Sequence, residues 1–498
     1  MPGYRLWLPA FIGFLLLHAG WAFAAPYNGP PDEQEHVLRA SGIMRGEVIA
    51  ESHPTGGIQT VPDSLYRGSC FPTKVEVAAS CEREPGGDES ELRVQTRAGR
   101  FNPVYYLVTS WPLGLWPNWT GILLARLLNG AAMAALLACA VVTAARWTRH
   151  RALVAGVVVA VTPMIAHLGG AINPSGVEIA AGIALFTALI AVVHDQREGV
   201  NRAAVVLAGV SASTLVTLRF TGVMWLAVIL GVILVPSSRA RLKTLVGSRT
   251  VRFWSVVVGV CVLASVAWVF LAQPVGAASA NAGLTFKEIL RFAVVDHMWP
   301  NVANQMVGVT GWAETLMPRL IYLVWFATLG VLTLGGLVVG KRADRWRLLA
   351  LFFATFTPLL GAEILFVNVI GWFNQGRYFL PGAVGLPLLG AYVLGRHAFT
   401  GEHFRSMTRM FATLLLPIHL ICLAYSMARW QSGLRSLNPF AGSWSPPLGS
   451  VPPLIVATLA VTLLFLTYWR ASGVSIPQPD SVEEQPGDTA RAETVGAR

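Results

Sequence analysis

Long apolar stretches separated by shorter polar runs fill the chain from its first residues to about residue 470. A helix crosses the hydrocarbon core of a bilayer with roughly 20 apolar residues, with wide scatter. Twelve stretches approach that length, over residues 6–25, 121–143, 152–168, 177–193, 203–218, 222–235, 253–272, 320–339, 348–369, 379–394, 410–427 and 454–469. The pattern predicts an all-α integral membrane protein of about twelve transmembrane helices.

Basic residues gather in every second loop between these stretches. They lie at Arg146, Arg151, Arg197, Arg202, Arg239, Arg241, Lys243, Lys341, Arg342, Arg345, Arg396 and Arg405, among others. An excess of Lys and Arg marks cytoplasmic loops. We therefore expect a multi-pass protein of the plasma (inner) membrane with both termini in the cytoplasm. Three hydrophilic regions, 26–120, 273–318 and 428–453, then lie outside, and we expect the function there.

Residues 1–470 read as one polytopic membrane domain, with a long first extracytoplasmic loop. Residues 471–498 are rich in Pro, Gly, Glu and Asp without hydrophobic periodicity, which predicts a disordered cytoplasmic tail. Arg5, the first apolar stretch and the small residues at 22–25 also fit a signal peptide with its cleavage site. The stretch exceeds the usual apolar core of roughly 7–15 residues, which favours an uncleaved first helix.

Composition agrees with a membrane protein. The chain is 54% hydrophobic and 13% charged, with a mean hydropathy of +0.56, whereas soluble domains carry about a quarter charged residues. The net charge of +11 comes largely from the orientation loops, so we expect no nucleic-acid partner. Of the five cysteines, only Cys70 and Cys81 share a hydrophilic loop. An oxidising compartment would permit a disulfide between them, and whether they pair is left open.

A polar constellation, Pro30-Pro31-Asp32-Glu33-Gln34-Glu35-His36, follows the first apolar stretch directly. One interpretation is a capping box, in which Asp32 and Glu35 satisfy backbone N–H groups at a helix start. The other is chemical, because carboxylates and a histidine at the rim of a membrane cavity act as general bases or metal ligands. A helix that began at Asp32 would place Asp32, His36 and Arg39 on one face. Its apolar face would rest on the membrane interface.

Polar residues within the apolar stretches supply further candidates. Intramembrane carboxylates are costly and usually face a cavity or a partner. For Glu178 and Glu363 the alternative is a structural hydrogen bond to a neighbouring helix, and Glu178, nearer the outer surface, is the better site candidate. Arg377 lies at the outer end of its stretch, where it either snorkels or clamps a phosphate through its guanidinium. Arg219 fits the same role.

Aromatic residues cluster before the second stretch, and membrane-interface anchoring explains most of them. Tyr105 and Tyr106 are also candidates for stacking on a sugar. His297 is a lone histidine in an outer loop, and we leave it outside the expected site.

Several motifs occur in a fixed order along the chain. They are Pro31-Asp32-Glu33 with His36, Asn102-Pro103-Val104-Tyr105-Tyr106, Asn173-Pro174-Ser175-Gly176 with Glu178, Gly311-Trp312, and Gly376-Arg377-Tyr378 with Pro381. Together they resemble the bacterial membrane-protein family named domain of unknown function 2142 (DUF2142), from about residue 5 to 430. That family looks like a member of the GT-C glycosyltransferases, multispanning enzymes that take a sugar from a polyprenyl phosphate on the extracytoplasmic side.

The resemblance implies a GT-C-like fold, a polyprenyl-phosphate sugar as donor, and an envelope glycan or lipid as acceptor. GT-C enzymes use an acidic residue after the first helix as catalytic base, and Asp32 or Glu33 occupies that position, with His36 to orient or share the proton. The expected donor-phosphate site is Arg377, Tyr378 and Arg219, and the expected substrate cavity is Asn173, Glu178, Tyr105 and Tyr106. The family pattern Asp-x-Asp is Asp-Glu here, so a divalent cation such as Mg or Mn on Asp32 and Glu33 is left open.

Two other classes of function stay open. A secondary transporter or flippase shares the plan of about twelve helices with both termini inside, although the long first outer loop and the lack of an internal repeat weigh against it. A noncatalytic envelope-assembly protein would use the carboxylates only as helix caps. An enzyme requires Asp32, His36, Glu178 and Arg377 to converge on one outward site, whereas a scaffold would disperse them.

Overall fold

The computed structural model of the chain describes residues 3–68, 70–86, 90–148, 151–194, 199–235, 237–273 and 283–473. From residue 474 onward, the predicted disordered tail lies outside the described residues, and the side chain of His297 is likewise not described.

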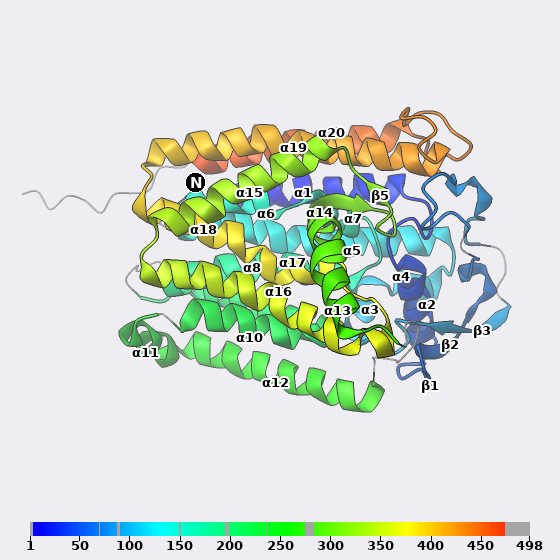
Figure 1. Ribbon diagram of the computed structural model, residues 1–498, viewed down its shortest axis with the longest axis horizontal. Helices are drawn as coiled ribbons and strands as arrows, with labels where there is room; N and C mark the ends of the chain where they lie inside the picture. The colour runs from blue at the N-terminus through cyan, green and yellow to red at the C-terminus, as the bar shows by residue number, and fades with distance from the viewer. Residues whose placement is uncertain are drawn as a thin grey trace, which may run out of the picture.

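Long helices running side by side build one bundle (Figure 1). Its helices are α1 (Tyr4–Ala24), α5 (Trp119–Val142), α6 (Ala152–Ala160), α7 (Pro163–Gly169), α8 (Pro174–Leu189), α9 (Arg202–Leu218), α10 (Thr221–Leu234), α12 (Arg249–Ala272), α15 (Arg319–Val339), α16 (Arg342–Ile370), α17 (Gly376–Ala383), α18 (Gly385–His397), α19 (Gly401–Ser432) and α20 (Val451–Gly473). Each of the twelve apolar stretches coincides with one of these helices or with a broken pair of them.

Within the described ranges, nine helices are long and apolar enough to cross a membrane, or ten if the bent pair α6 and α7 is one span. The bend of 63° falls at Pro163, which has no N–H to continue α6. With 17 and 14 residues, α9 and α10 are shorter. The helical membrane architecture is therefore confirmed, while the count of twelve spans stays a prediction.

Burial separates central from peripheral helices. Every residue in the apolar window of α8 is buried, whereas only 11% of the window in α12 is buried. The exposed side chains of α12 are large and apolar, with Phe253, Leu263 and Phe270 each more than 60% exposed. Such a surface suits lipid rather than water.

Glycines allow the closest helix contacts. A Cβ on Gly390 of α18 would lie 2.4 Å from the Leu332 carbonyl oxygen of α15, and one on Gly182 of α8 would lie 2.7 Å from the Pro381 carbonyl oxygen of α17. These backbones touch directly, as small residues permit in membrane bundles. The contact at Gly182 fixes α17, and hence Arg377, against the central helix.

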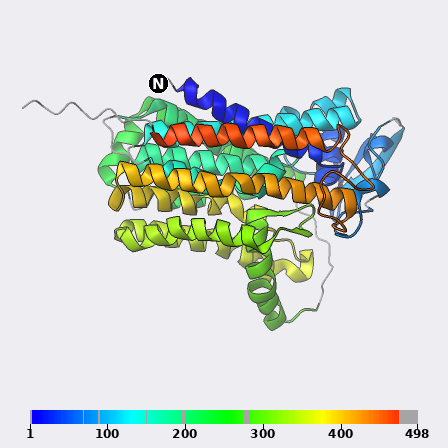
Figure 2. The ribbon, with the colours of Figure 1, turned by 90° about the horizontal axis from the view of Figure 1, so that it is seen from above.

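The two ends of the bundle differ. One end holds the N-terminal residues, α11 (Arg239–Gly247) and the α15–α16 and α18–α19 junctions, and α20 finishes there as well (Figures 1 and 2). The opposite end, called here the outer end, carries most of the three hydrophilic regions. The basic loops therefore share the end opposite to the large first loop.

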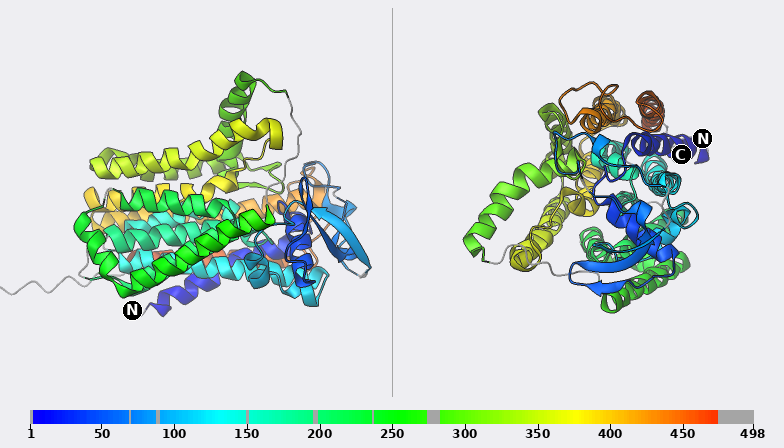
Figure 3. Two further views of the ribbon diagram at one scale, coloured as in Figure 1. Left: turned by 90° about the horizontal axis from the view of Figure 1, so that it is seen from below. Right: turned by 90° about the vertical axis from the view of Figure 1, so that its right-hand side faces the viewer.

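The first hydrophilic region folds into a small layer at the outer end (Figure 3, left). It contains α2 (Glu33–Met44), β1 (Glu51–His53), β2 (Gly56–Pro62), β3 (Glu91–Thr96), α3 (Val104–Thr109) and α4 (Pro112–Leu115). The strands form an antiparallel sheet in the order β1-β2-β3, with Ile58 opposite Gln95. This sheet was not expected in an all-α protein, because its short half-buried strands leave no signal at the length scale of a membrane span.

The described parts of the other two hydrophilic regions pack beside this layer. The region before α15 contains α13 (Phe286–Arg291), a π-helical segment (Phe292–Val302), α14 (Ala303–Gly308) and a hairpin of β4 (Val309–Thr310) and β5 (Thr315–Leu316). In Figures 1 and 2, α13 runs crosswise to the long helices.

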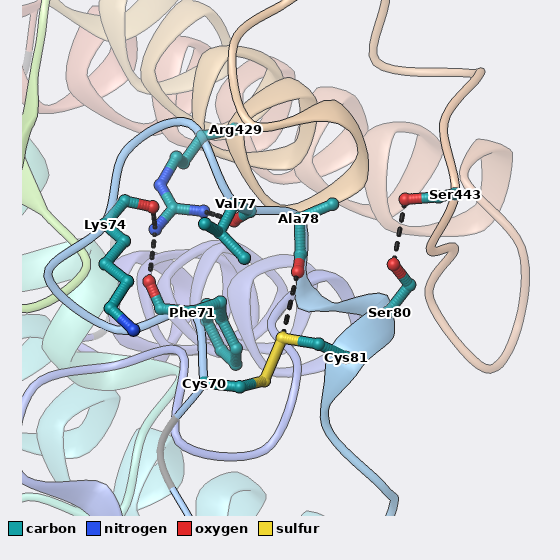
Figure 4. Close-up of a disulfide and its surroundings, with 9 residues drawn as sticks. All are labelled: Cys70, Phe71, Lys74, Val77, Ala78, Ser80, Cys81, Arg429 and Ser443. Atoms are coloured by element: carbon teal, nitrogen blue, oxygen red, sulfur yellow. Dashed lines mark hydrogen bonds between the residues drawn. A yellow bond between two sulfur atoms is a disulfide. The ribbon is translucent and has the colours of Figure 1, made fainter.

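A disulfide joins Cys70 to Cys81 in the first outer region. The loop that it closes sits on the last turn of α19, where Arg429 enters it (Figure 4). Arg429 donates to the carbonyl oxygens of Val77 at 2.7 Å, Phe71 at 2.9 Å and Lys74 at 3.0 Å. The first loop is thereby attached to a helix that lies more than 350 residues away in the sequence.

We expect Gly390→Ala to lower the free energy of unfolding by about 1–3 kcal/mol, because the new methyl group must displace the backbone of α15. Gly259→Ala in α12 is the matched control, since no atom lies within 4 Å of its added Cβ. Thermal unfolding in detergent micelles measures both variants. Equal melting temperatures for the two would contradict the direct contact between α15 and α18.

Candidate functional site

Asp32 begins the candidate site, directly before α2. Its backbone is left-handed, with φ 57° and ψ 14°. Outside glycine this conformation is uncommon and costs roughly 1–2 kcal/mol, although Asp and Asn tolerate it best. The Asp32 carboxylate makes no capping hydrogen bond to α2. The capping-box interpretation of Asp32 is therefore wrong. Without a bond to α2, the left-handed backbone needs support from neighbouring residues.

Glu33 provides the first support for the left-handed backbone of Asp32. Its carboxylate accepts two hydrogen bonds from Arg126 of α5, at 2.7 Å and 2.5 Å, and both side chains are fully buried. Arg126 also donates to the carbonyl oxygens of Ala22, Ala25 and Pro26 at the end of α1. Glu33 is thus committed to a buried ion pair that ties the start of α2 to α1 and α5, and it is not free to act as a base.

Asn173 provides the second support. Its side-chain amide donates to the Pro31 carbonyl oxygen at 2.9 Å, while its Oδ1 caps α8 through the Ser175 N–H. Since Pro31 precedes and Glu33 follows Asp32, the backbone is held on both sides of the left-handed residue. The expected cavity residue Asn173 therefore acts here through the Asp32 backbone.

The Asp32 carboxylate pairs with the guanidinium of Arg377, which also donates to the Tyr378 hydroxyl at 3.2 Å. Arg377 is 3% exposed and Asp32 is 24% exposed, so the pair is reachable from the Asp32 side. Burial alone would raise the pKa of Asp32, but the electrostatic effect of its neighbours, Arg377 first among them, outweighs burial and lowers the pKa below its ordinary value. Asp32 is consequently an ionised carboxylate near neutral pH.

His36 lies one turn into α2, on the same side as Asp32. Its Nδ1 is 2.8 Å from the Tyr106 hydroxyl, and its Nε2 is buried without a hydrogen-bond partner among the described residues. Burial, followed by the charge of Arg219, lowers the pKa of His36 to about 3. The ring is therefore neutral at physiological pH, and its Nε2 has no partner among the described residues.

Arg219 follows α9 and faces the same group of side chains. Its guanidinium lies over the rings of Tyr378 at 5.2 Å and Phe101 at 5.7 Å, and it makes no hydrogen bond or ion pair in the described chain. The Nε atoms of Arg219 and Arg377 are both buried and unpartnered among the described residues. Glu178 accepts from Thr221 at 3.3 Å and interacts electrostatically with Arg219.

The structure therefore brings together Asp32, His36, Tyr106, Arg219, Arg377, Tyr378 and, behind Arg219, Glu178. Guanidinium groups with unused N–H groups have the chemistry to bind an anion such as a phosphate, and two of them lie beside one carboxylate here. Tyr105 points elsewhere, since its hydroxyl donates to Asn129 at 2.9 Å.

The described residues of this site do not build a metal centre. No group of three or more His, Cys, Asp or Glu side chains in the described ranges is placed to hold an ion. Asp32 is engaged by Arg377 and Glu33 by Arg126. The pair Asp32 and Glu33 thus does not fit a shared divalent cation, and the chemistry below uses none.

Two further expectations change. Nine of the twelve residues of α2 are buried, because β2, α3 and α4 cover it, so α2 does not rest one face on the membrane interface. Glu35 does not cap the helix either; it accepts from Thr96 Oγ1 at 2.7 Å and from the Arg97 N–H at 2.6 Å. Glu363 makes structural hydrogen bonds, although not to a neighbouring helix as weighed above. It accepts from the Phe373 and Asn374 N–H groups in the loop between its own helix, α16, and Arg377.

Some residues of the site were missed in the sequence. Arg126 carries a charge inside an apolar stretch and so needed a buried partner, which is a signal that the sequence does contain. Phe101, which lies under Arg219 and 6.1 Å from the His36 ring, has no comparable signal, because nothing local distinguishes it from a core residue.

Comparisons with known proteins agree with a membrane protein. The model of the family described as predicted membrane protein (DUF2142) matches residues 15–386. None of the curated proteins is significantly similar to the chain. Among solved structures, ArnT from Cupriavidus metallidurans, both bound to undecaprenyl phosphate and in the apo state, aligns with 95% of this chain and 77% of its own. The identity is 12% and the TM-score is 0.44 in both cases.

We expect Glu33→Gln to destabilise the protein by about 3–5 kcal/mol, because it leaves the Arg126 charge buried and unpaired. Arg126→Met should cost more, since it also removes the donors to three carbonyl oxygens of the α1 end. Combining the two changes should cost clearly less than their sum. Chemical unfolding in detergent gives the three values, and simple additivity would show that the residues do not form a coupled pair.

Glu82, beside the disulfide, gives a pH prediction. Both of its carboxylate oxygens are buried without a partner among the described residues, and burial raises its pKa to about 8, against the opposing charge of Arg67. The folded protein favours the protonated form of Glu82. The contribution of this group to the free energy of unfolding is therefore fully present below about pH 4.5 and is lost as pH rises through 8. Glu82→Gln should flatten that decline in melting temperature, whereas the exposed Glu84→Gln should not. An unchanged decline in Glu82→Gln would contradict this assignment.

Proposed function

We propose that this chain, which belongs to the DUF2142 family of predicted membrane proteins, transfers a sugar from a polyprenyl phosphate to an acceptor outside the cytoplasm. The observation that carries the proposal is the convergence of a carboxylate, Asp32, with Arg377 and Arg219 at the outer end of a membrane bundle. A phosphate linked to a prenyl chain would reach the site at headgroup depth. The GT-C resemblance of the motifs that contain Asp32 and Arg377 supports the same reaction class.

In this reaction Asp32 accepts the proton of an acceptor hydroxyl. The hydroxyl oxygen attacks the anomeric carbon, the bond between that carbon and the phosphate oxygen breaks, and the polyprenyl phosphate leaves with the electron pair. Arg377 and Arg219 stabilise the charge that appears on the phosphate. His36 orients the acceptor through its free Nε2, while Tyr106 fixes the ring.

Arg377 has two tasks in this scheme. It pairs with Asp32 before the donor arrives, and its unpartnered Nε is available to the phosphate. A phosphate that draws the guanidinium away from Asp32 also raises the pKa of that carboxylate and makes it a better base. Donor binding thus prepares the proton acceptor at the moment when it is needed.

The location favours an enzyme over the other two classes. A scaffold would disperse these polar residues, and a transporter would place them near the bilayer midplane, as substrate sites in transporters lie there. The plasma membrane as location and the cytoplasmic position of both termini belong to this proposal, on the strength of the basic loops at the opposite end of the bundle.

We expect Asp32→Asn to change transfer and binding in opposite directions. Transfer should fall by about 100-fold or more, the usual contribution of a general base. Binding of undecaprenyl phosphate to the purified protein should be at least as tight as in the wild type, because Arg377 no longer has a competing carboxylate. Lipid-linked sugars and envelope glycans in cells, compared among wild type, deletion and Asp32→Asn, report the transfer.

Arg377→Gln should weaken undecaprenyl phosphate binding by about 10- to 100-fold, as the loss of a charged hydrogen bond does. The matched control is Arg93→Gln, which removes an exposed arginine paired with Glu51 on the sheet. Undecaprenol, which lacks the phosphate, is the matched ligand. Glycans that are identical in wild type, deletion and Asp32→Asn, or equal binding of undecaprenol and its phosphate, would refute the proposed function.

A further inference from the structure

The β4–β5 hairpin brings a tryptophan to the turn that precedes Asp32. Its tip contains two residues with left-handed backbone, Gly311 and Ala313, both at φ 66°. Trp312 lies between them and is partly exposed. Gly311-Trp312 is one of the motifs noted in the sequence, and the reaction described above gives it no task.

Trp312 contacts the turn through one directed hydrogen bond. Its indole Nε1 donates to the Asn28 carbonyl oxygen at 2.9 Å. Asn28 is itself left-handed at φ 57°, so the turn from Asn28 to Asp32 contains two non-glycine residues in this uncommon conformation. Neighbours must hold such a turn in place.

Glu314 holds Trp312 in turn. Its Oε2 accepts from the Trp312 backbone N–H at 2.5 Å, and its Oε1 accepts from Thr315 Oγ1 at 3.0 Å. A Cβ at Gly311 would lie 2.2 Å from Glu314 Oε1, so glycine is required for the carboxylate to fold back over the tip. The Glu314 side chain thus fixes the hairpin from inside.

Arg429 connects this hairpin to the disulfide-closed loop. Its Nη2 lies 3.3 Å from Glu314 Oε1, and its fully buried guanidinium also binds the three carbonyl oxygens of that loop (Figure 4). A buried charge keeps its geometry only while its partners stay in place. The loop between Cys70 and Cys81 therefore holds Arg429, which holds Glu314.

We infer that Trp312 is a positioning residue for Asp32, fixed by Glu314 and Arg429 and, through Arg429, by the disulfide-closed loop. The inference rests on the proposed function of Asp32. Asn173 bonds the turn at Pro31, and Arg126 bonds it at Glu33. Trp312 supplies a third bond, at Asn28. Without it the turn relaxes toward ordinary backbone angles, and the Asp32 carboxylate moves away from the acceptor.

The test removes the indole N–H together with the five-membered ring that carries it, and keeps a phenyl ring at the hairpin tip. Trp312→Phe should lower the glycan product in cells by about 3- to 10-fold, the effect of one neutral hydrogen bond, while the affinity of the purified protein for undecaprenyl phosphate stays within twofold. Amide hydrogen exchange over residues 26–36 should become faster, and exchange over β2 and β3 should not change. Glu314→Gln should shift both readouts in the same direction and serves if Trp312→Phe does not accumulate.

The matched control is Trp325→Phe, which also removes one indole N–H bonded to a backbone carbonyl, that of Val159 at 3.0 Å inside the bundle. It should lower stability without changing exchange over residues 26–36 or the amount of product. Normal product and normal exchange in both Trp312→Phe and Glu314→Gln would overturn the inference even if Asp32→Asn abolishes transfer. Normal glycans in Asp32→Asn would instead refute the proposed function, and the exchange data would still decide whether Trp312 holds the turn.

Discussion

A buried ion pair, Arg126 with Glu33, is the interaction on which the outer end depends. Neither charge reaches water, so each requires the other, and Arg126 has further bonds to the last carbonyl oxygens of α1. The pair therefore fixes where the first helix stops and where α2 begins. Asp32 lies between these two points, and its left-handed backbone is bonded on both sides, at Pro31 and at Glu33.

Adjacent acidic residues thus have opposite roles. Glu33 is fully buried and pairs with the equally buried Arg126, whereas Asp32 is 24% exposed and pairs with Arg377. Under the proposed function, consecutive positions supply one structural carboxylate, Glu33, and one reactive carboxylate, Asp32.

The sequence predicted the membrane helices well, because the length of an apolar stretch is set by the bilayer. It also placed Asp32, His36 and Arg377 in one site, through the order of motifs. It did not distinguish Asp32 from Glu33, since their roles depend on Arg126 and Arg377, which lie about 90 and 345 residues away. The sheet, the enclosure of α2 and the roles of Phe101 and Trp312 likewise come from tertiary contacts without a local pattern.

The separation of 345 residues between Asp32 and Arg377 has a consequence for biogenesis. The ribosome adds Asp32 to the chain early and adds Arg377 only after most of the helices. Any chain that is cut or stalled before α17 carries the acidic turn without its counterion. The pair of Asp32 and Arg377 can therefore exist only in a chain whose insertion is nearly finished. Under the proposed function, an unfinished chain in the membrane would not consume a lipid-linked sugar.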